Sequence, residues 1–161
     1  MDVSASFQFL VDALAGDWHV IAPDWRGFGL TARPTDAPGV DGYWFPDYLA
    51  DLDALLRHYA GDEAPVHLVG HSMGGNIACL YAGVRPNRVS TLVSLEGFGL
   101  PRAKPEWAPK RFAQWLDEMR APPTMKAYAS LDEVARRLMK NNPRLGETRA
   151  RYLAEHWSRP D

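Results

Sequence analysis

The stretch Val66-His67-Leu68-Val69-Gly70-His71-Ser72-Met73-Gly74-Gly75 decides which fold this chain is predicted to adopt. It begins with a short apolar run typical of a buried strand, and the segment Asn76–Ala82 that follows it reads as a helix. Between them lies a G-x-S-x-G sequence, which is informative only in such a strand–turn–helix setting. Because the setting is present, we interpret Ser72 as an exposed nucleophile. The alternative is a chance match, since glycine and serine are common in loops.

A turn this tight strains the serine backbone and brings the strand close to the helix. Gly70, Gly74 and Gly75 are expected to leave room for that contact because glycine has no Cβ. His71 is expected to support the turn by packing rather than to act as a base, because its side chain points away from the neighbouring serine. The backbone N–H of Met73, at the start of the helix, is a candidate oxyanion-hole donor.

Predicted helices and strands alternate on both sides of this motif. On its N-terminal side, residues 7–14 have the apolar spacing of an amphipathic helix, His19–Ala22 reads as a short buried strand, and residues 46–61 predict a second helix. On its C-terminal side, Val89–Leu95 predicts another strand. This alternation is typical of the α/β fold class, in which helices cover both faces of a parallel sheet.

The composition changes after this last strand. Five prolines interrupt the next segment, and no strand-like run follows them. Short helices are predicted instead over residues 110–120, 130–140 and 145–157. Ser130 and Glu133 have the spacing of a capping box at the start of the second of these helices.

Composition and charge exclude several classes of protein. The chain has 161 residues, of which 46% are hydrophobic, and a formal net charge of −2. A nucleic-acid surface needs clustered lysine and arginine, and a membrane span needs about 20 consecutive apolar residues; the sequence has neither pattern. No metal-ligand spacing occurs, and the single cysteine, Cys79, fits a reducing, cytoplasmic setting. We therefore expect no nucleic acid, no metal and no membrane span, and the oligomeric state stays open.

The segment Asp24-x-Arg26-Gly27-x-Gly29, a helix, a strand and Gly70–Gly75 follow one another in this order. With these motifs the chain resembles the α/β-hydrolase superfamily, in particular its esterase-like and serine-hydrolase-like members. The resemblance implies a partial α/β-hydrolase fold whose core occupies residues 1–97 as helix, strand, helix, elbow strand and helix, and strand. Residues 98–161 would form the start of a helical cap, and no cofactor is implied.

The resemblance also implies parts that this chain does not contain. The family's oxyanion-hole loop would end where the chain begins, and its usual acid and histidine would follow the cap. The chain is therefore interpreted as an internal fragment of a protein of about 250–300 residues, the size at which such a fold closes one core.

The histidines support this interpretation, because a serine hydroxyl needs a base within hydrogen-bond reach. His19 and His67 lie in predicted strands, His58 lies near the end of a helix, and His156 lies in the predicted cap. With His71 assigned to packing, none of the five is a good base. The base is expected to lie outside the chain.

Two acidic residues lie at predicted strand ends. Glu96 ends the strand after the motif and could reach a histidine beside Ser72, as in some family members that place their acid there. The alternative, which we favour, makes Glu96 a loop or hinge residue. Asp24 is expected to organise its loop through hydrogen bonds rather than to serve as the acid.

These inferences predict a serine hydrolase that cleaves carboxylic esters or related acyl substrates through an acyl-enzyme. A serine at the elbow argues against the carboxylate chemistry of epoxide hydrolases and haloalkane dehalogenases. The alternative is a non-catalytic, truncated or degenerate family member. Aromatic residues suggest a small apolar acyl substrate, although each is also a candidate core residue: Tyr43, Trp44, Phe98, Trp107, Phe112 and Trp115.

Overall fold

A computed structural model of the chain describes residues 3–31, 43–97, 99, 102–121 and 127–158. The chain groups into two compact units. One combines Met1–Asp51 with Tyr128–Asp161, and the other is Leu52–Ala127. The division into a core over residues 1–97 and a cap over residues 98–161 stays a prediction.

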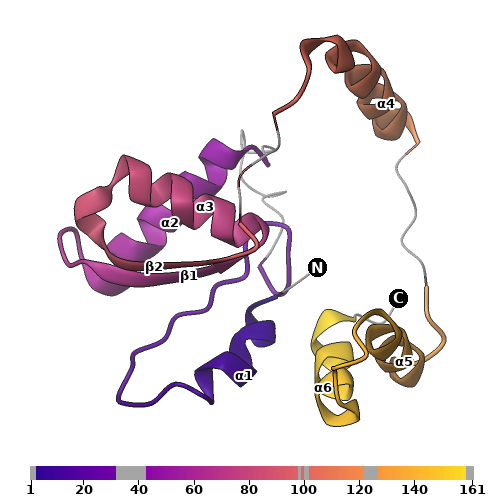
Figure 1. The fold of residues 1–161 in the computed structure, drawn as a ribbon, viewed down its shortest axis with the longest axis horizontal. Coiled ribbons are helices and arrows are strands. Elements are labelled where there is room, and N and C mark those ends of the chain that lie inside the picture. Colours follow the sequence, from indigo (N-terminus) through magenta and orange to yellow (C-terminus); the bar gives the residue numbers. More distant parts are fainter. Residues whose placement is uncertain (1–2, 32–42, 98, 100–101, 122–126, 159–161) are drawn as a thin grey trace. The chain divides into compact units, whose positions relative to one another are not determined.

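The centre of the second unit is a pair of parallel strands, β1 (Val66–His71) and β2 (Val89–Leu95). Parallel neighbours need a crossover connection, which α3 (Met73–Val84) and the short helix η2 (Pro86–Arg88) supply (Figure 1). The strand predicted at Val89–Leu95 is confirmed with these bounds, and so is the strand–turn–helix setting of the motif.

One face of this strand pair packs against α3, which contacts both strands. Burial alternates along β1, with Leu68 and Gly70 more buried than Val69. On the opposite face, Val69, Val93 and Leu95 are between 41% and 44% exposed. The sequence predicted helices on both faces. Within the described residues, the crossover covers the face that Leu68 and Gly70 share.

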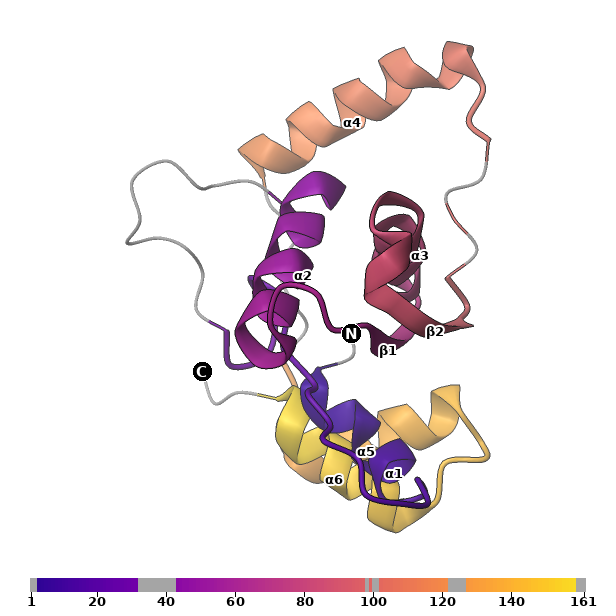
Figure 2. The same ribbon diagram turned by 90° about the vertical axis from the view of Figure 1, so that its left-hand side faces the viewer.

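The helix α2 (Phe45–Ala60) lies beside α3 (Figures 1 and 2). The hydroxyl of Tyr81 on α3 donates a 2.8 Å hydrogen bond to a carboxylate oxygen of Asp53 on α2. At the end of η2, Arg88 donates a 2.7 Å bond to the carbonyl of Gly61. Gly61 has a φ of 74° and ends α2 as predicted. These bonds connect the C-terminal half of α2 to the crossover.

In the first unit, α5 (Leu131–Asn141) packs against α6 (Glu147–Trp157) through small side chains. Ala135, Ala150 and Ala154 are at most 3% exposed. Their small size lets the two helices approach closely. Partly buried apolar side chains surround this contact: Val134, Leu138, Met139 and Leu145.

The N-terminal segment of the same unit, η1 (Ser4–Phe7) and α1 (Gln8–Val11), packs against α6. The indole N–H of Trp157 donates a 2.9 Å hydrogen bond to the hydroxyl of Ser6. The rings of Phe9 and Tyr152 meet edge to face with centroids 5.1 Å apart. The two ends of the chain's first unit are thus joined by one polar and one aromatic contact.

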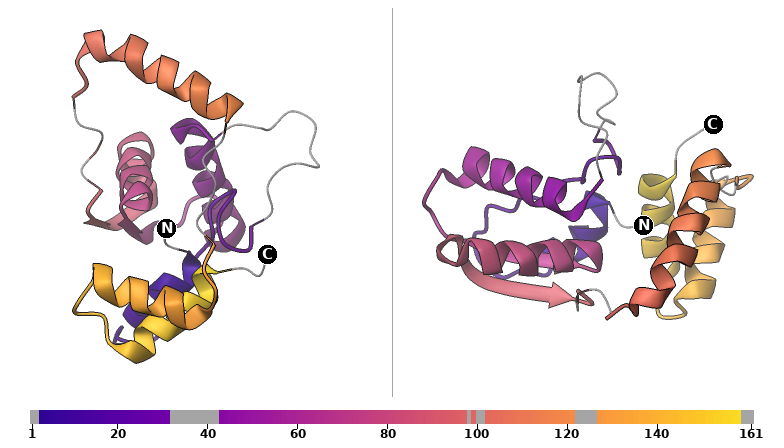
Figure 3. Two further views of the ribbon diagram at one scale, coloured as in Figure 1. Left: turned by 90° about the vertical axis from the view of Figure 1, so that its right-hand side faces the viewer. Right: turned by 90° about the horizontal axis from the view of Figure 1, so that it is seen from above.

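The helices predicted after residue 97 are confirmed. α4 (Ala108–Arg120) follows the short helix η3 (Pro105–Trp107), and α5 and α6 follow it in sequence (Figure 3). Ser130 caps α5 by accepting a 3.2 Å bond from the N–H of Glu133, as predicted. The Glu133 carboxylate reaches Ala129 rather than the backbone of Ser130. No helix in the described part of the chain is long and apolar enough to cross a membrane.

The strand predicted at His19–Ala22 is wrong. These residues form no ladder, and Val20 and Ile21 are each 40% exposed. An apolar run becomes a strand only when another strand accepts its hydrogen bonds, and the sheet of the described residues contains β1 and β2 alone. The first helix is also shorter than predicted, since α1 ends at Val11.

The contact between Tyr81 and Asp53 yields a pH-dependent prediction. Burial, and secondly the hydrogen bond to Asp53, raise the pKa of Tyr81 above its ordinary value of 10.0. Above that pH the unfolded chain loses the phenolic proton first, so stability falls until the folded pKa is passed. Tyr81→Phe should lower the free energy of unfolding by about 1–2 kcal/mol at pH 7, and the deficit should shrink above pH 10.

Urea unfolding of both proteins at pH 7 and at pH 10.5–11 measures this difference. Tyr59, which is 50% exposed on α2, provides the matched control Tyr59→Phe and should change stability little. A deficit of Tyr81→Phe that stays constant across this pH range contradicts the assignment.

Candidate active site

Ser72 occupies a strained turn between β1 and α3. Its φ of 51° and ψ of −114° lie outside the regions that residues with a Cβ ordinarily adopt. The residue is exposed, at the end of β1. The backbone therefore places Ser72, exposed, at the carboxyl edge of the sheet, and its role as the nucleophile stays a prediction.

Two backbone hydrogen bonds hold this turn. The N–H of Ser72 donates a 2.7 Å bond to the carbonyl of Leu95, the last residue of β2. The carbonyl of Ser72 accepts a 3.0 Å bond from the N–H of Asn76, which is the first bond of α3. The strained residue is thus bonded to the neighbouring strand on one side and to its own helix on the other.

Close backbone packing explains why glycine occupies these positions around Ser72. A Cβ built on Gly70 would lie 2.4 Å from the carbonyl oxygen of Gly74, and one on Gly75 would lie 3.0 Å from the Cα of Gly97. A Cβ on Gly97 would in turn meet the backbone of Gly75 at 2.5 Å. The support predicted for Gly70 and Gly75 therefore has a steric basis, and the backbone of Gly74 is what a side chain at Gly70 would meet. Gly97 was not predictable from the sequence, because no motif marks a glycine two residues after a strand.

Met73 is the first residue of α3. The N–H groups of the first helical turn have no acceptor within the helix and carry its partial positive charge. The N–H of Met73 is therefore suited to stabilise an anion formed beside Ser72. Its part in an oxyanion hole stays a prediction.

Glu96 follows β2 directly, at the sheet edge where Ser72 lies. It has a φ of 58°, so it is the second residue with a Cβ in the left-handed region among the described residues. Its side chain is 79% exposed, and Oε2 lies 3.7 Å from Nε2 of His71. The structure brings Ser72, His71 and Glu96 to one edge, and a carboxylate there could orient a histidine.

The described structure shows no histidine of this unit hydrogen-bonded to the hydroxyl of Ser72. No hydrogen bond among the described residues joins its hydroxyl to His58, His67 or His71. The ring of His58 lies against Tyr59. His19 and His156 belong to the other unit, where Nδ1 of His156 lies 2.7 Å from the carbonyl of Tyr152, one turn earlier in α6.

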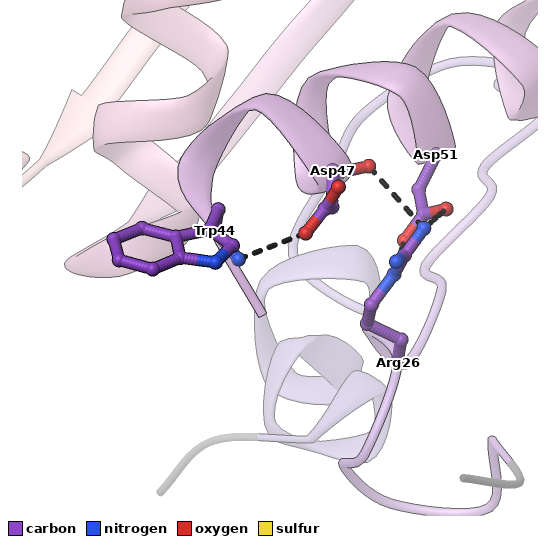
Figure 4. A network of polar contacts seen from close by, with 4 residues as sticks. All are labelled: Arg26, Trp44, Asp47 and Asp51. Carbon is purple, nitrogen blue, oxygen red and sulfur yellow. Dashed lines mark hydrogen bonds and ion pairs between the residues drawn. The ribbon is translucent and has the colours of Figure 1, made fainter. Parts of the chain in front are cut away.

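The loop that begins at Asp24 is organised by charged side chains. Asp24 accepts hydrogen bonds from the N–H groups of Ser4 at 2.6 Å and Leu30 at 2.8 Å, as its predicted structural role requires. Arg26 forms a two-point ion pair with Asp51 on α2 (Figure 4). This pair raises the pKa of Arg26. Arg26 also donates a 3.4 Å bond to the carbonyl of Asp47, whose carboxylate accepts a 3.0 Å bond from the N–H of Trp44 (Figure 4).

The aromatic residues predicted to line a pocket are mostly exposed. Their exposed fractions are 49% for Tyr43, 74% for Trp44, 45% for Trp107, 63% for Phe112 and 51% for Trp115. Phe98 lies outside the described residues.

Two hollows of about 370 and 460 Å³ occur on α6 and around residues 62–63 and 84–88, and neither is lined by Ser72. No group of three or more histidine, cysteine, aspartate or glutamate side chains in the described ranges could hold a metal ion.

Comparison with known proteins places these features in context. The model of a family described as "alpha/beta hydrolase fold" matches residues 2–159. A serine hydrolase-like protein of Danio rerio is 35% identical over 98 residues, covering 61% of this chain and 28% of that protein. The 2-hydroxymuconate semialdehyde hydrolase of Pseudomonas sp. (strain CF600) is 38% identical over 96 residues, covering 60% and 32%.

Solved structures of hydrolases are also similar to this chain. The thioesterase domain from the curacin biosynthetic pathway superimposes with a TM-score of 0.82 at 27% identity, covering 99% of this chain and 56% of that domain. E-2-(acetamidomethylene)succinate hydrolase superimposes with a TM-score of 0.68 at 26% identity, covering 99% and 54%. The chain spans about a third of the two curated relatives and a little over half of these structures.

The glycine contact at the elbow yields a prediction with a control in the same helix. Gly75→Ala places a Cβ against Gly97, Gly70 and Ser94, so it should lower the free energy of unfolding by about 1–3 kcal/mol. Gly83→Ala, near the end of α3, meets nothing within 4 Å and should raise it by up to about 1 kcal/mol through helix propensity.

Urea unfolding of both variants at pH 7 is the measurement. Two alanine substitutions in one helix that shift stability in the same direction would contradict the close approach at Gly75.

Proposed function

The chain belongs to the alpha/beta hydrolase fold family, and from that premise we propose that the complete protein is a serine hydrolase. It would cleave carboxylic esters or related acyl substrates through an acyl-enzyme. The observation that carries this proposal is the positive φ of Ser72, which is costly for a residue with a Cβ and exposes the hydroxyl beside the N-terminus of α3.

In the proposed reaction, Ser72 Oγ attacks the acyl carbon while its proton passes to a histidine base. The carbonyl oxygen becomes an oxyanion, which the N–H of Met73 and a second donor stabilise. The leaving oxygen departs with the proton, and water then releases the acyl group. Each such donor contributes about 3 kcal/mol of transition-state stabilisation.

The base is proposed to come from outside this chain. The hydrogen bonds among the described residues assign no histidine to Ser72, and the solved relatives are almost twice as long as the chain. The 161 residues alone should therefore show little turnover.

We assign Glu96 the role of the acid that orients the histidine. Three observations favour this role over that of an ordinary loop residue. Glu96 follows a strand that is hydrogen-bonded to Ser72, its carboxylate is exposed at the same edge, and its backbone is strained. A strained residue persists only where the surrounding structure requires it.

The substrate is proposed to be a small or medium apolar acyl compound, and the chemistry requires no cofactor. Trp107, Phe112 and Trp115 support this class, because they supply apolar surface in the segment that follows Glu96. The single cysteine, Cys79, is consistent with the reducing, cytoplasmic setting that we propose.

Substitution of Ser72 tests the proposal. In the complete protein, Ser72→Ala should abolish labelling by a fluorophosphonate probe and lower p-nitrophenyl ester turnover by at least about 10³-fold, because the nucleophile is lost. The matched control is Ser90→Ala, which removes an exposed hydroxyl near the opposite end of β2 and should leave both unchanged.

Full turnover by Ser72→Ala would show that the nucleophile assignment is wrong. A complete wild-type protein that neither reacts with the probe nor cleaves esters, thioesters or amides would favour the non-catalytic alternative.

A further inference from the structure

The backbone that follows Glu96 is fastened to α3. The N–H of Gly99 donates a 2.6 Å hydrogen bond to Oδ1 of Asn76. The carbonyl of Gly97 accepts a 3.1 Å bond from the hydroxyl of Ser94, and the backbone of Gly97 lies against that of Gly75. The thiol of Cys79 also lies 3.9 Å from the carbonyl of Gly97, so Gly97 and Gly99 have three hydrogen bonds and one steric contact to their own unit.

Asn76 makes a bond on each side of the candidate site. Its backbone N–H donates to the carbonyl of Ser72 at 3.0 Å, while its side chain accepts the N–H of Gly99. One residue thus connects the strained serine with the segment that follows the strained glutamate. The α-helical backbone provides the first bond for any residue at this position, but the second requires a side-chain acceptor of this length.

Helix propensity gives no reason for an asparagine here. Asparagine is less favourable than alanine inside a helix, and it favours caps and turns instead. The backbone conformation of Glu96, with a φ of 58°, is energetically costly, since only glycine adopts this region without cost. A bond that fixes Gly99, which itself has a φ of 81°, helps to retain this turn.

We propose that Asn76 is a positioning residue of the active site. Through its bond to Gly99 it holds the turn at Glu96, so that the carboxylate stays at the sheet edge beside Ser72. This inference rests on the proposed serine hydrolase and on the role of Glu96 in it. It assigns Asn76 no contact with substrate.

The simplest alternative is that Asn76 stabilises the fold without affecting Glu96. The two readings differ in how substitutions combine. If Asn76 acts through Glu96, its loss matters only while Glu96 is present. If it acts on stability alone, the effects of the two substitutions on kcat are independent.

A double-mutant cycle in the complete protein distinguishes them. Asn76→Ala should lower kcat for a p-nitrophenyl ester by about 10- to 100-fold with little change in KM, as expected for a misplaced catalytic group. In a Glu96→Ala background, the same substitution should lower kcat by less than about twofold. Asn76→Asp retains an acceptor of the same length and should recover most of the activity.

Asn87→Ala, an exposed substitution on η2 in the same unit, is the matched control and should leave kcat unchanged. Should Asn76→Ala fail to fold, Asn76→Ser keeps a small polar side chain too short to reach Gly99. Circular dichroism and the urea midpoint show which variants fold.

Equal kcat losses from Asn76→Ala with and without Glu96 would overturn the proposal, as would unchanged kcat in folded Asn76→Ala and Asn76→Ser. Ser72→Ala, measured in the same assay, separates this result from failure of the proposed function. If Ser72→Ala retains turnover, the serine hydrolase proposal fails. If it abolishes turnover while the cycle is additive, only the role of Asn76 fails.

Discussion

The candidate site depends on close backbone packing where β1, α3 and the residues after β2 meet, with the hydroxyl of Ser94 beside Gly75 and Gly97. Gly70 lies against Gly74, and Gly75 lies against Gly97. Any Cβ at three of these positions would approach a backbone atom to 3.0 Å or less. Because the helix starts so close to the strands, the residue that joins β1 to α3 has little conformational choice. That residue is Ser72.

The same contact explains why two strained residues lie side by side. Ser72 and Glu96 each follow a strand, and each has a positive φ that costs about 1–3 kcal/mol. Such a cost is retained where several interactions act together. For Ser72 these are the bonds to Leu95 and Asn76; for Glu96 they are the contacts of the segment that follows it. The strain is therefore concentrated where the chain leaves the sheet.

The sequence predicted the elements whose signals are local. The bounds of β2 follow from its apolar, β-branched run, α2 ends at the predicted Gly61, and Ser130 caps α5. The elbow was predictable because a turn that tight permits few residue types. The error at His19–Ala22 has the opposite cause. An apolar run indicates a strand only if a partner lies beside it, and the sequence of the run holds no information about the partner.

Contacts between distant residues could not be predicted in this way. The bond between Asn76 and Gly99 joins two unremarkable residues 23 positions apart, and that between Trp157 and Ser6 spans 151 positions. Gly97 belongs to the same class, since its need for a missing Cβ arises only when α3 packs against it. In each case the chemistry of the residue is ordinary and its role comes from the neighbour that folding supplies.

The geometry of the candidate site separates the residues proposed for the reaction, which the backbone positions, from the exposed aromatic side chains. Ser72, Met73 and Glu96 lie within two short segments whose ends are held by the β1–β2 ladder, so their spacing depends on backbone bonds rather than on the exposed aromatic side chains. Changes in those side chains would leave the backbone bonds that position Ser72 intact. Because the elbow is defined by its backbone, side chains beyond Gly99 can vary as long as Gly97 keeps its contact with Gly75 and Gly99 its hydrogen bond to Asn76.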